Sequence, residues 1–161
     1  MRIAIALLPM LLGVLLLAGC GKPAAATYTL SAEDNSRFLA DNGKRSDVKT
    51  TASGLQYRVI TAGHGARVTG PGDIVTVRYR GWTIDGHVFD QTQPGQTAQF
   101  PAGGLIPGWV EALKLMQVGD KWQLVIPPDL GYGSEGAGAD IPPNQTLVFD
   151  MELVAVNTST P

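Results

Sequence analysis

The sequence predicts an α+β protein in which a curved antiparallel β-sheet packs around one short α-helix. Four segments alternate apolar and polar residues with a period of two, as half-buried strands do. Residues 108–116 instead repeat their apolar residues at helical spacing, and they are a good candidate to cover the apolar face of the sheet. The chain has 161 residues, which is enough for one domain with a real core and too few for two.

The alternating segments are residues 55–60, 74–80, 121–126 and 146–153. Because one side of each segment is apolar and the other polar, we expect an antiparallel sheet with one covered face and one wet face. Asp85-Gly86 predicts a tight hairpin turn after the second segment. The residues predicted to face the core are Leu55, Tyr57, Val59, Val75, Val77, Tyr79, Trp122, Leu124, Ile126, Leu147, Phe149, Met151 and Leu153.

The covering helix carries Trp109, Leu113 and Met116 along one stripe. Pro107 precedes it, and Gly119 is expected to end it.

A second helix is predicted from Ser31 to Gly43. Ser31 lies three residues before Asp34, in a pattern that resembles a capping box, and Gly43 is a natural stop. This helix is too short to be stable alone, so it must pack on something.

Residues 1–19 predict a secretory signal peptide. Arg2 supplies a positive charge, and an apolar run follows that is slightly short for a spanning helix and contains Pro9 and Gly13. A retained single-pass anchor is the alternative. Cys20 comes directly after this run. Because it is the only cysteine in the sequence, it has no intramolecular disulfide partner.

The stretch "LAGC", residues 17–20, resembles the bacterial lipobox, whose cysteine is lipidated and becomes the new N-terminus. Lipid on Cys20 would hold the protein at a membrane without spanning it. No aspartate follows Cys20, which by the same resemblance implies the outer membrane. We expect the periplasmic side, with surface exposure as the alternative.

We therefore divide the chain into a lipidated cysteine, flexible tether and short helix at 20–50, a folded domain at 51–156 and a tail at 157–161. The tether, residues 21–27, is small and contains a proline.

Charge and histidine content argue against two classes of function. The net charge is −2 and there is no run of basic residues, which argues against nucleic acid as the main partner. His64 and His87 lie in glycine-flanked turns without the further ligands that a metal site requires.

The stretch "GYGSEG", residues 131–136, has the spacing of a dinucleotide-binding loop. That motif must open a helix, but the following residues contain Pro142-Pro143 and further glycines. Ser134 lacks the glycine two places before it and the later histidine of a hydrolase nucleophile. From these residues alone, the interpretation of residues 131–136 as an ordinary surface loop is still possible.

Three longer stretches resemble the FKBP-type peptidyl-prolyl cis-trans isomerases. These are "VRYRGWTIDGHVFD" (77–90), "LIPGWVEALKLMQVGDKWQLVIPPDLGYG" (105–133) and "IPPNQTLVFDMELV" (141–154). The resemblance covers about residues 50–156, and the lead-in 38–57 resembles the Mip-like bacterial branch. It implies a half-open antiparallel sheet wrapped over one short helix.

The resemblance also implies a pocket between that helix and the concave face of the sheet, with Trp109 as its floor. The Ile106 backbone N–H and the Tyr132 hydroxyl would hold substrate carbonyls, and Asp90 would order the polar edge. Without the resemblance, Tyr79 and Phe89 would be ordinary core aromatics. The implied catalytic residues are Tyr79, Phe89, Asp90, Ile106, Trp109, Tyr132 and Phe149, with Leu105 and Ile141 as further substrate-binding residues.

Two positions depart from the family pattern. Ala98 stands where a larger wall residue is usual, and Asp140 where an apolar one is common. Glutamines replace the arginine that commonly partners the aspartate, so the partner of Asp90 is open. We expect a shallower or more polar rim that weakens binding of macrolide-type inhibitors.

The expected activity is isomerisation of X-Pro bonds in exported polypeptides, without metal or cofactor. The alternative is a chaperone or a surface virulence module that uses the same pocket without turnover. Mip-like relatives often dimerise through long N-terminal helices, but only residues 31–44 are available here, so we expect a monomer.

Overall fold

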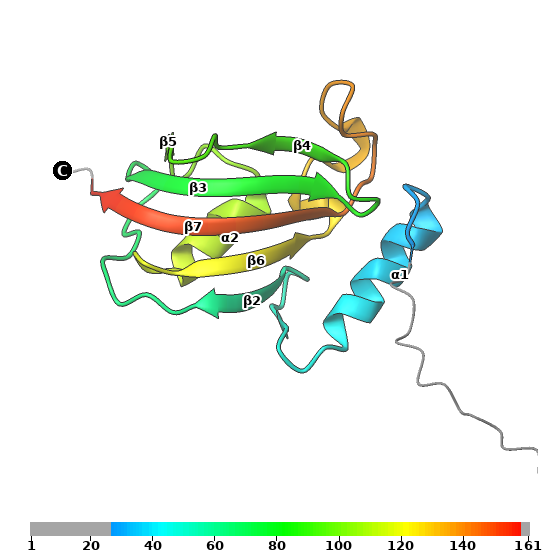
Figure 1. The fold of residues 1–161 in the computed structure, drawn as a ribbon, viewed down its shortest axis with the longest axis horizontal. Coiled ribbons are helices and arrows are strands. Elements are labelled where there is room, and N and C mark those ends of the chain that lie inside the picture. Colours follow the sequence, from blue (N-terminus) through cyan, green and yellow to red (C-terminus); the bar gives the residue numbers. More distant parts are fainter. Residues whose placement is uncertain (1–26, 159–161) are drawn as a thin grey trace, which may run out of the picture.

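A computed structural model describes residues 27–158, which form a seven-stranded antiparallel sheet and two α-helices (Figure 1). The strand order is β1-β2-β6-β7-β3-β4, with β5 pairing on β3. The predicted α+β fold class is confirmed. The elements are α1 (Ala32–Gly43), β1 (Lys49–Thr50), β2 (Gln56–Thr61), β3 (Ile74–Thr83), β4 (Val88–Gln91), β5 (Ala98–Pro101), α2 (Pro107–Leu115), β6 (Lys121–Ile126), the 3₁₀ helices η1 (Pro128–Leu130) and η2 (Gly133–Glu135), and β7 (Leu147–Asn157).

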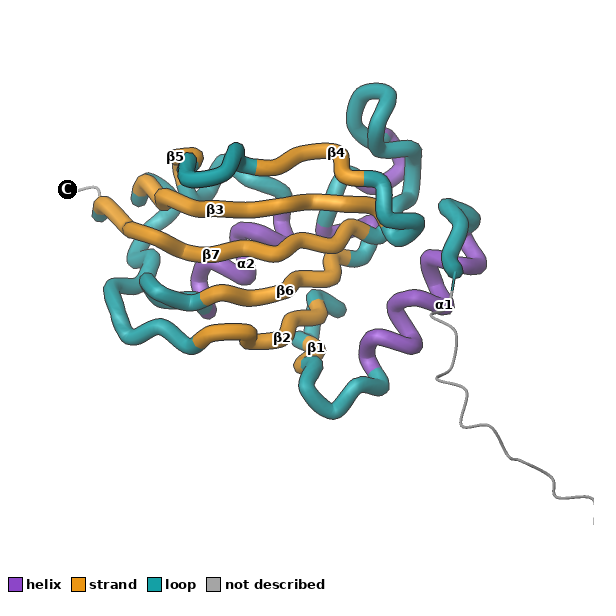
Figure 2. Tube along the Cα trace, viewed as in Figure 1, coloured by secondary structure: helices purple, strands orange, loops and turns teal. Residues whose placement is uncertain are grey.

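The inner face of the sheet is the apolar one, and α2 lies across it (Figure 2). Leu124 on β6 lies opposite Phe149 on β7, and both are buried with Leu113 of α2. Because side chains alternate across a strand, the predicted inward residues of β6 and β7 share this face. The core is therefore a helix packed on a sheet, as expected.

The start of α2 is set by Pro107, which occupies the first turn where its missing N–H is not needed. Gly108 then allows the helix to approach the sheet, since a Cβ at this position would lie 2.7 Å from Ile126 Cγ2. The helix ends at Leu115, with Met116 as its C-cap, a residue earlier than predicted.

The outer face is not wet along its whole length, which corrects the simple two-face prediction. Val125 and Val148 point to this face and are nevertheless only 2% and 3% exposed. Together with Tyr28 and Phe38 from the N-terminal segment, they line a cleft of about 360 Å³ between α1 and the sheet. Helix α1 thus packs at one end of the outer face (Figure 1).

The predicted alternation also fails in β2. Val59 was expected in the core but is 43% exposed, and Gln56 was expected in solvent but is 7% exposed. One edge of β2 pairs with β6 along the strand, but on the other edge only the two-residue β1 pairs with its start, so that edge of its second half has no strand partner. Gln56 is covered because its side chain accepts a hydrogen bond from Asn42 Nδ2 at 2.8 Å and donates one to the Leu39 carbonyl at 3.0 Å.

The predicted cap of α1 is confirmed. The Ser31 hydroxyl accepts the Asp34 backbone N–H at 3.1 Å, and the Asp34 carboxylate accepts the Thr29 N–H at 2.7 Å. The Asp85-Gly86 turn is also present: Gly86 has φ +92°, and its N–H donates to Thr83 O at 2.8 Å.

The predicted signal peptide and Cys20 lie outside the described residues. Within residues 27–158, no helix is long and apolar enough to cross a membrane.

Candidate active site

An aromatic cavity of about 400 Å³ opens between the inner face of the sheet and the start of α2. Its walls come from β3, β4, β5, β7, α2 and the loop before η2. The residues that line it are Tyr79, Phe89, Asp90, Phe100, Gly104, Leu105, Ile106, Trp109, Tyr132 and Phe149.

Trp109 forms the buried floor and is 4% exposed. Its ring meets Tyr79 edge-on, with centroids 5.1 Å apart and an interplanar angle of 82°. Phe149 meets it in the same way at 5.2 Å and 81°, and Phe100 at 6.1 Å and 84°. These edge-to-face contacts fix the indole from several sides.

Gly81 on β3 makes room for two of the walls. A Cβ at this position would lie 2.5 Å from the Phe149 ring and 2.8 Å from the Phe89 ring. The two phenylalanines pack edge-to-face at 5.5 Å and 84°. Gly81 is therefore required by the aromatic packing and not by its backbone conformation.

The polar edge of the cavity is a tyrosine–carboxylate pair. The Tyr79 hydroxyl donates a hydrogen bond of 2.6 Å to Asp90 Oδ2. The hydrogen-bond partner of Asp90, which the sequence left undetermined, is therefore Tyr79. Burial, followed by this hydrogen bond, raises the pKa of Tyr79 well above its ordinary value.

Tyr132 also lines the cavity and is 39% exposed. Burial, and after it the charge of Asp90, raises the pKa of Tyr132. Both phenols at this edge therefore keep their protons at neutral pH and are able to donate hydrogen bonds.

Ile106 is the N-cap residue of α2, and its carbonyl accepts the first helical N–H groups. No hydrogen bond among residues 27–158 takes up the backbone N–H of Ile106 itself. Ile106 and Tyr132 both line the cavity, and each carries a hydrogen-bond donor, a backbone N–H and a phenol hydroxyl.

The structure brings together nearly all of the residues expected at the site. Ile141 is the exception: it is 5% exposed, belongs to the core cluster and bridges to Ala137. Neither Ala98 nor Asp140 lines the cavity; Ala98 lies opposite Val77. Asp140 instead lies 3.5 Å from His87 Nε2.

Phe100 lines the cavity but was missed from the sequence. It lies on β5 two residues after Ala98, so both point to the same side of the strand. The alternation of Ala98, Gln99 and Phe100 was the signal that would have found it.

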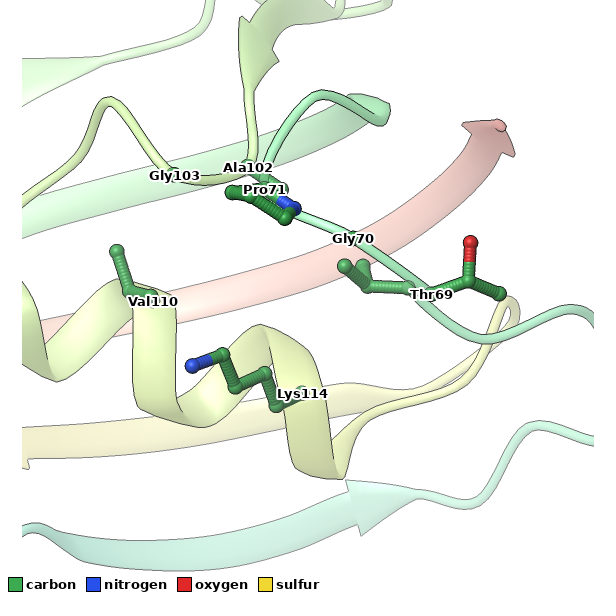
Figure 3. Close-up of a pocket in the computed structure, with 8 residues that line it drawn as sticks. Thr69, Gly70, Pro71, Ala102, Gly103, Val110 and Lys114 are labelled. Carbon is green, nitrogen blue, oxygen red and sulfur yellow. The ribbon is translucent and has the colours of Figure 1, made fainter. Parts of the chain in front are cut away.

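A second cavity of about 360 Å³ lies beside the other turns of α2 (Figure 3). Val110 and Lys114 of the helix face Pro71 and Gly103 across it. Its lining contains no aromatic side chain, so it does not share the chemistry of the first cavity.

Residues 27–158 contain no cluster of three or more histidine, cysteine or acidic side chains that could hold a metal ion.

The family model described as FKBP-type peptidyl-prolyl cis-trans isomerase matches residues 65–154. The chain belongs to this family. A second model, for the domain amino terminal to FKBP-type peptidyl-prolyl isomerases, matches residues 21–59.

Individual relatives agree with this assignment. The FKBP-type 22 kDa peptidyl-prolyl cis-trans isomerase of Escherichia coli K12 is 51% identical over 130 residues, which is 80% of this chain and 63% of that protein. Outer membrane protein MIP of Legionella longbeachae is 43% identical over 137 residues, covering 82% of this chain and 58% of the relative. The chain thus spans about three fifths of the length of these relatives.

Solved structures show the same fold. FkpA from Escherichia coli superposes with a TM-score of 0.74 at 42% identity, covering 80% of this chain and 60% of FkpA. A peptidyl-prolyl cis-trans isomerase from Pseudomonas syringae gives 0.73 at 40% identity, covering 78% of this chain and 92% of the solved one.

Proposed function

We propose that this protein catalyses the cis-trans isomerisation of X-Pro peptide bonds in polypeptides. The observation that supports this most strongly is the apolar cavity floored by Trp109, with hydrogen-bond donors at its edge. The family to which the chain belongs, and the names of its relatives, support the same activity.

The chemistry needs no nucleophile. Rotation about a peptide bond is opposed by a barrier of ~18–20 kcal/mol because amide resonance is lost in the twisted state. Water stabilises the planar, charge-separated amide, so transfer of the bond into an apolar cavity weakens that resonance. A proline ring would pack on Trp109, between the walls of Phe89 and Phe149.

The edge of the cavity would hold the peptide during rotation. The Ile106 N–H and the Tyr132 hydroxyl would donate to substrate carbonyls, while Asp90 holds the Tyr79 hydroxyl in place. Every ~1.4 kcal/mol by which these contacts favour the twisted amide over the planar one raises the rate tenfold.

The test is the cis-to-trans relaxation of a Leu-Pro peptide, with and without the protein. We expect acceleration by the wild type and a large loss in Trp109→Ala. Absence of acceleration, or equal rates for the two proteins, would contradict the proposal. Peptide binding without acceleration would favour a binding module that uses the same cavity.

We further propose that residues 1–19 are a signal peptide and that lipid on Cys20 tethers the isomerase to the outer membrane, on its periplasmic side. The lipobox-like stretch before Cys20 supports this, and one relative is named an outer membrane protein. Its clients would then be exported polypeptides, and the tethered protein would be a monomer.

Metabolic labelling with a radioactive fatty acid tests the tether. Wild type should carry label and sediment with outer membranes, whereas Cys20→Ser should lose both properties. Label that persists in Cys20→Ser would contradict lipidation at this residue.

A further inference from the structure

Helix α1 reaches the loop of the candidate active site through one buried side chain, Asn35, which is 4% exposed. Asn35 Oδ1 accepts the Thr146 backbone N–H at 2.7 Å, and its Nδ2 donates to Gln145 Oε1 at 3.0 Å. Nδ2 also donates to the Ser31 carbonyl at 2.9 Å within its own helix. Thr146 and Gln145 are 0% and 5% exposed, so these bonds are shielded from water.

The contacted residues end the segment that begins at Tyr132. Gln145 Nε2 donates to the Pro143 carbonyl at 3.0 Å and to the Leu30 carbonyl at 3.1 Å. The next residue back, Asn144, donates its N–H to the Gly133 carbonyl at 2.7 Å. A continuous set of bonds thus leads from α1 to the residue beside Tyr132.

The far side of the segment is equally constrained. The Gly136 N–H donates to the Tyr132 carbonyl at 3.2 Å. Gly136 has φ +66°, and a Cβ on it would lie 2.3 Å from the Ile141 carbonyl oxygen. Tyr132 and residues 144–146 are therefore linked through closely packed backbone at both ends of the loop.

We propose that Asn35 is a positioning residue for Tyr132 and that α1 is for this reason part of the catalytic apparatus. This inference rests on the proposed isomerase function. Asn35 lies in residues 21–59, which the N-terminal family model matches. The proposal therefore gives this segment a role in the activity of residues 65–154, which the isomerase model matches. Figure 1 shows the start of α1 beside the loop that leads into β7.

Asparagine suits this position because its amide is a donor and an acceptor at once. The same side chain must receive the Thr146 N–H and give a hydrogen bond to Gln145. Aspartate would lose the donor and leucine would lose both functions, leaving a buried N–H unpaired.

The other end of α1 supplies a matched control. Asn42 Nδ2 also donates across the helix–sheet boundary, to Gln56 Oε1 at 2.8 Å on β2. Among the described residues, no hydrogen bond of the Asn42 side chain reaches the 131–146 loop. Asn42→Ala therefore weakens the docking of α1 without touching the segment that holds Tyr132.

The first test compares kcat/KM for a Leu-Pro peptide in Asn35→Ala and Asn42→Ala, at a temperature where both remain folded. We expect Asn35→Ala to lower kcat/KM about threefold to tenfold, the range that the loss of one or two hydrogen bonds produces. Asn42→Ala should stay within about twofold of wild type, since no positioned group is lost. Equal values for the two variants would overturn the proposal.

A second test separates positioning from a loss of stability. In a Tyr132→Ala background, Asn35→Ala should have no further effect on kcat/KM but should lower the melting temperature as much as it does in wild type. Two residues that act through one another are non-additive in this way. An equal loss of kcat/KM in both backgrounds would overturn the proposal.

Amide hydrogen exchange followed by NMR gives a readout independent of activity. Asn35→Ala should lower protection at Thr146, Asn144 and Gly136, whereas Asn42→Ala should leave these amides unchanged. If wild type shows no isomerase activity, the proposed function fails, and this experiment still decides whether α1 holds the loop. Unchanged protection at Asn144 and Gly136 in Asn35→Ala would overturn the inference. If Asn35→Ala does not fold, Gln145→Ala removes the acceptor of the Asn35 Nδ2 bond and leaves the Thr146 bond in place. It should lower protection at Asn144 and Gly136, and unchanged protection at both amides would overturn the inference.

Discussion

Two tryptophans of the core, Trp109 on α2 and Trp122 on β6, have nearly the same burial and very different surroundings. Trp109 is 4% exposed and Trp122 is 5% exposed, and neither indole N–H finds an acceptor within residues 27–158. Trp109 is met edge-on by its aromatic neighbours and borders the 400 Å³ cavity. Trp122 is stacked face to face on Tyr57, with centroids 4.4 Å apart and an interplanar angle of 9°, and does not line that cavity.

The difference comes from the elements that carry the two residues. Trp109 lies in the first turn of α2, just after Pro107, where the chain leaves the loop and space remains above the ring. Trp122 lies within β6, opposite Val59 of β2, and Tyr57 covers its flat face. Burial alone therefore does not distinguish a site residue from a core residue, whereas the open volume beside it does.

The difference between the two tryptophans is tested most strongly by replacing each of them with leucine. Trp109→Leu should lower kcat/KM for a Leu-Pro peptide at least about tenfold, because the proposed floor for the proline ring is gone. Trp122→Leu should stay within about twofold of wild type, since only core packing changes. Kinetics at a temperature where both variants remain folded decides the matter.

Stability provides the control for this pair. Both variants should lose unfolding free energy, each by less than the ~3–5 kcal/mol of a full truncation to alanine. A loss of activity in Trp122→Leu equal to that of Trp109→Leu would remove the distinction between the two regions.

Gly81 tests whether the walls of the cavity matter as much as its floor. Gly81→Ala should push the Phe89 and Phe149 rings apart, costing about 1–3 kcal/mol of stability through overpacking. We expect kcat/KM to fall about threefold to tenfold, as a modest loss of packing in the transition state would produce. Gly70→Ala is the matched control, because a Cβ there meets nothing within 4 Å; a similar loss in both variants would contradict a role for the walls.

Tyr132 should show a smaller effect, divided between its ring and its hydroxyl. Tyr132→Phe keeps the wall and removes one donor, so a decrease in kcat/KM of about threefold is expected. Tyr132→Ala should cost more, since the wall is lost as well. Full activity in Tyr132→Ala would mean that the loop is only a surface turn.

The smallest effect concerns Tyr79 and pH. Because the pKa of Tyr79 is raised above its ordinary value of 10.0, the folded state favours the protonated phenol. The stability that this supplies is complete below pH 10 and decreases as the pH rises further, since the unfolded chain then gains from ionisation. The difference in unfolding free energy between wild type and Tyr79→Phe should therefore be constant from pH 7 to about pH 9.5 and change only above it. Urea unfolding across this range measures it, and a change near neutral pH would contradict the shift.

Much of the fold was predictable because it rests on local patterns. The alternation in β6 and β7 and the stripe on α2 placed Leu124, Phe149 and Leu113 in the core, where the structure has them. Trp109 could be singled out by its place after Pro107, but its proposed task came from the family resemblance. The pattern alone allowed Tyr79 and Phe149 to be ordinary core residues.

What could not be predicted depends on contacts between distant segments. The Tyr79–Asp90 bond requires the pairing of β3 with β4, and no local pattern contains it. The burial of Val125 and Val148 follows from where α1 docks, which the alternation of the strands does not encode. Asn35 and Thr146 are 111 residues apart in the chain and meet only in the folded protein.

The central claim, that a proline peptide binds at Trp109, is tested most directly by the indole N–H signals of the three tryptophans. Their resonances in a nitrogen-edited NMR spectrum can be followed while a Leu-Pro peptide is added. The Trp109 signal should shift with saturation, and the Trp122 signal should stay in place. A shift at Trp122 with an unmoved Trp109 would contradict the assignment of the cavity as the active site.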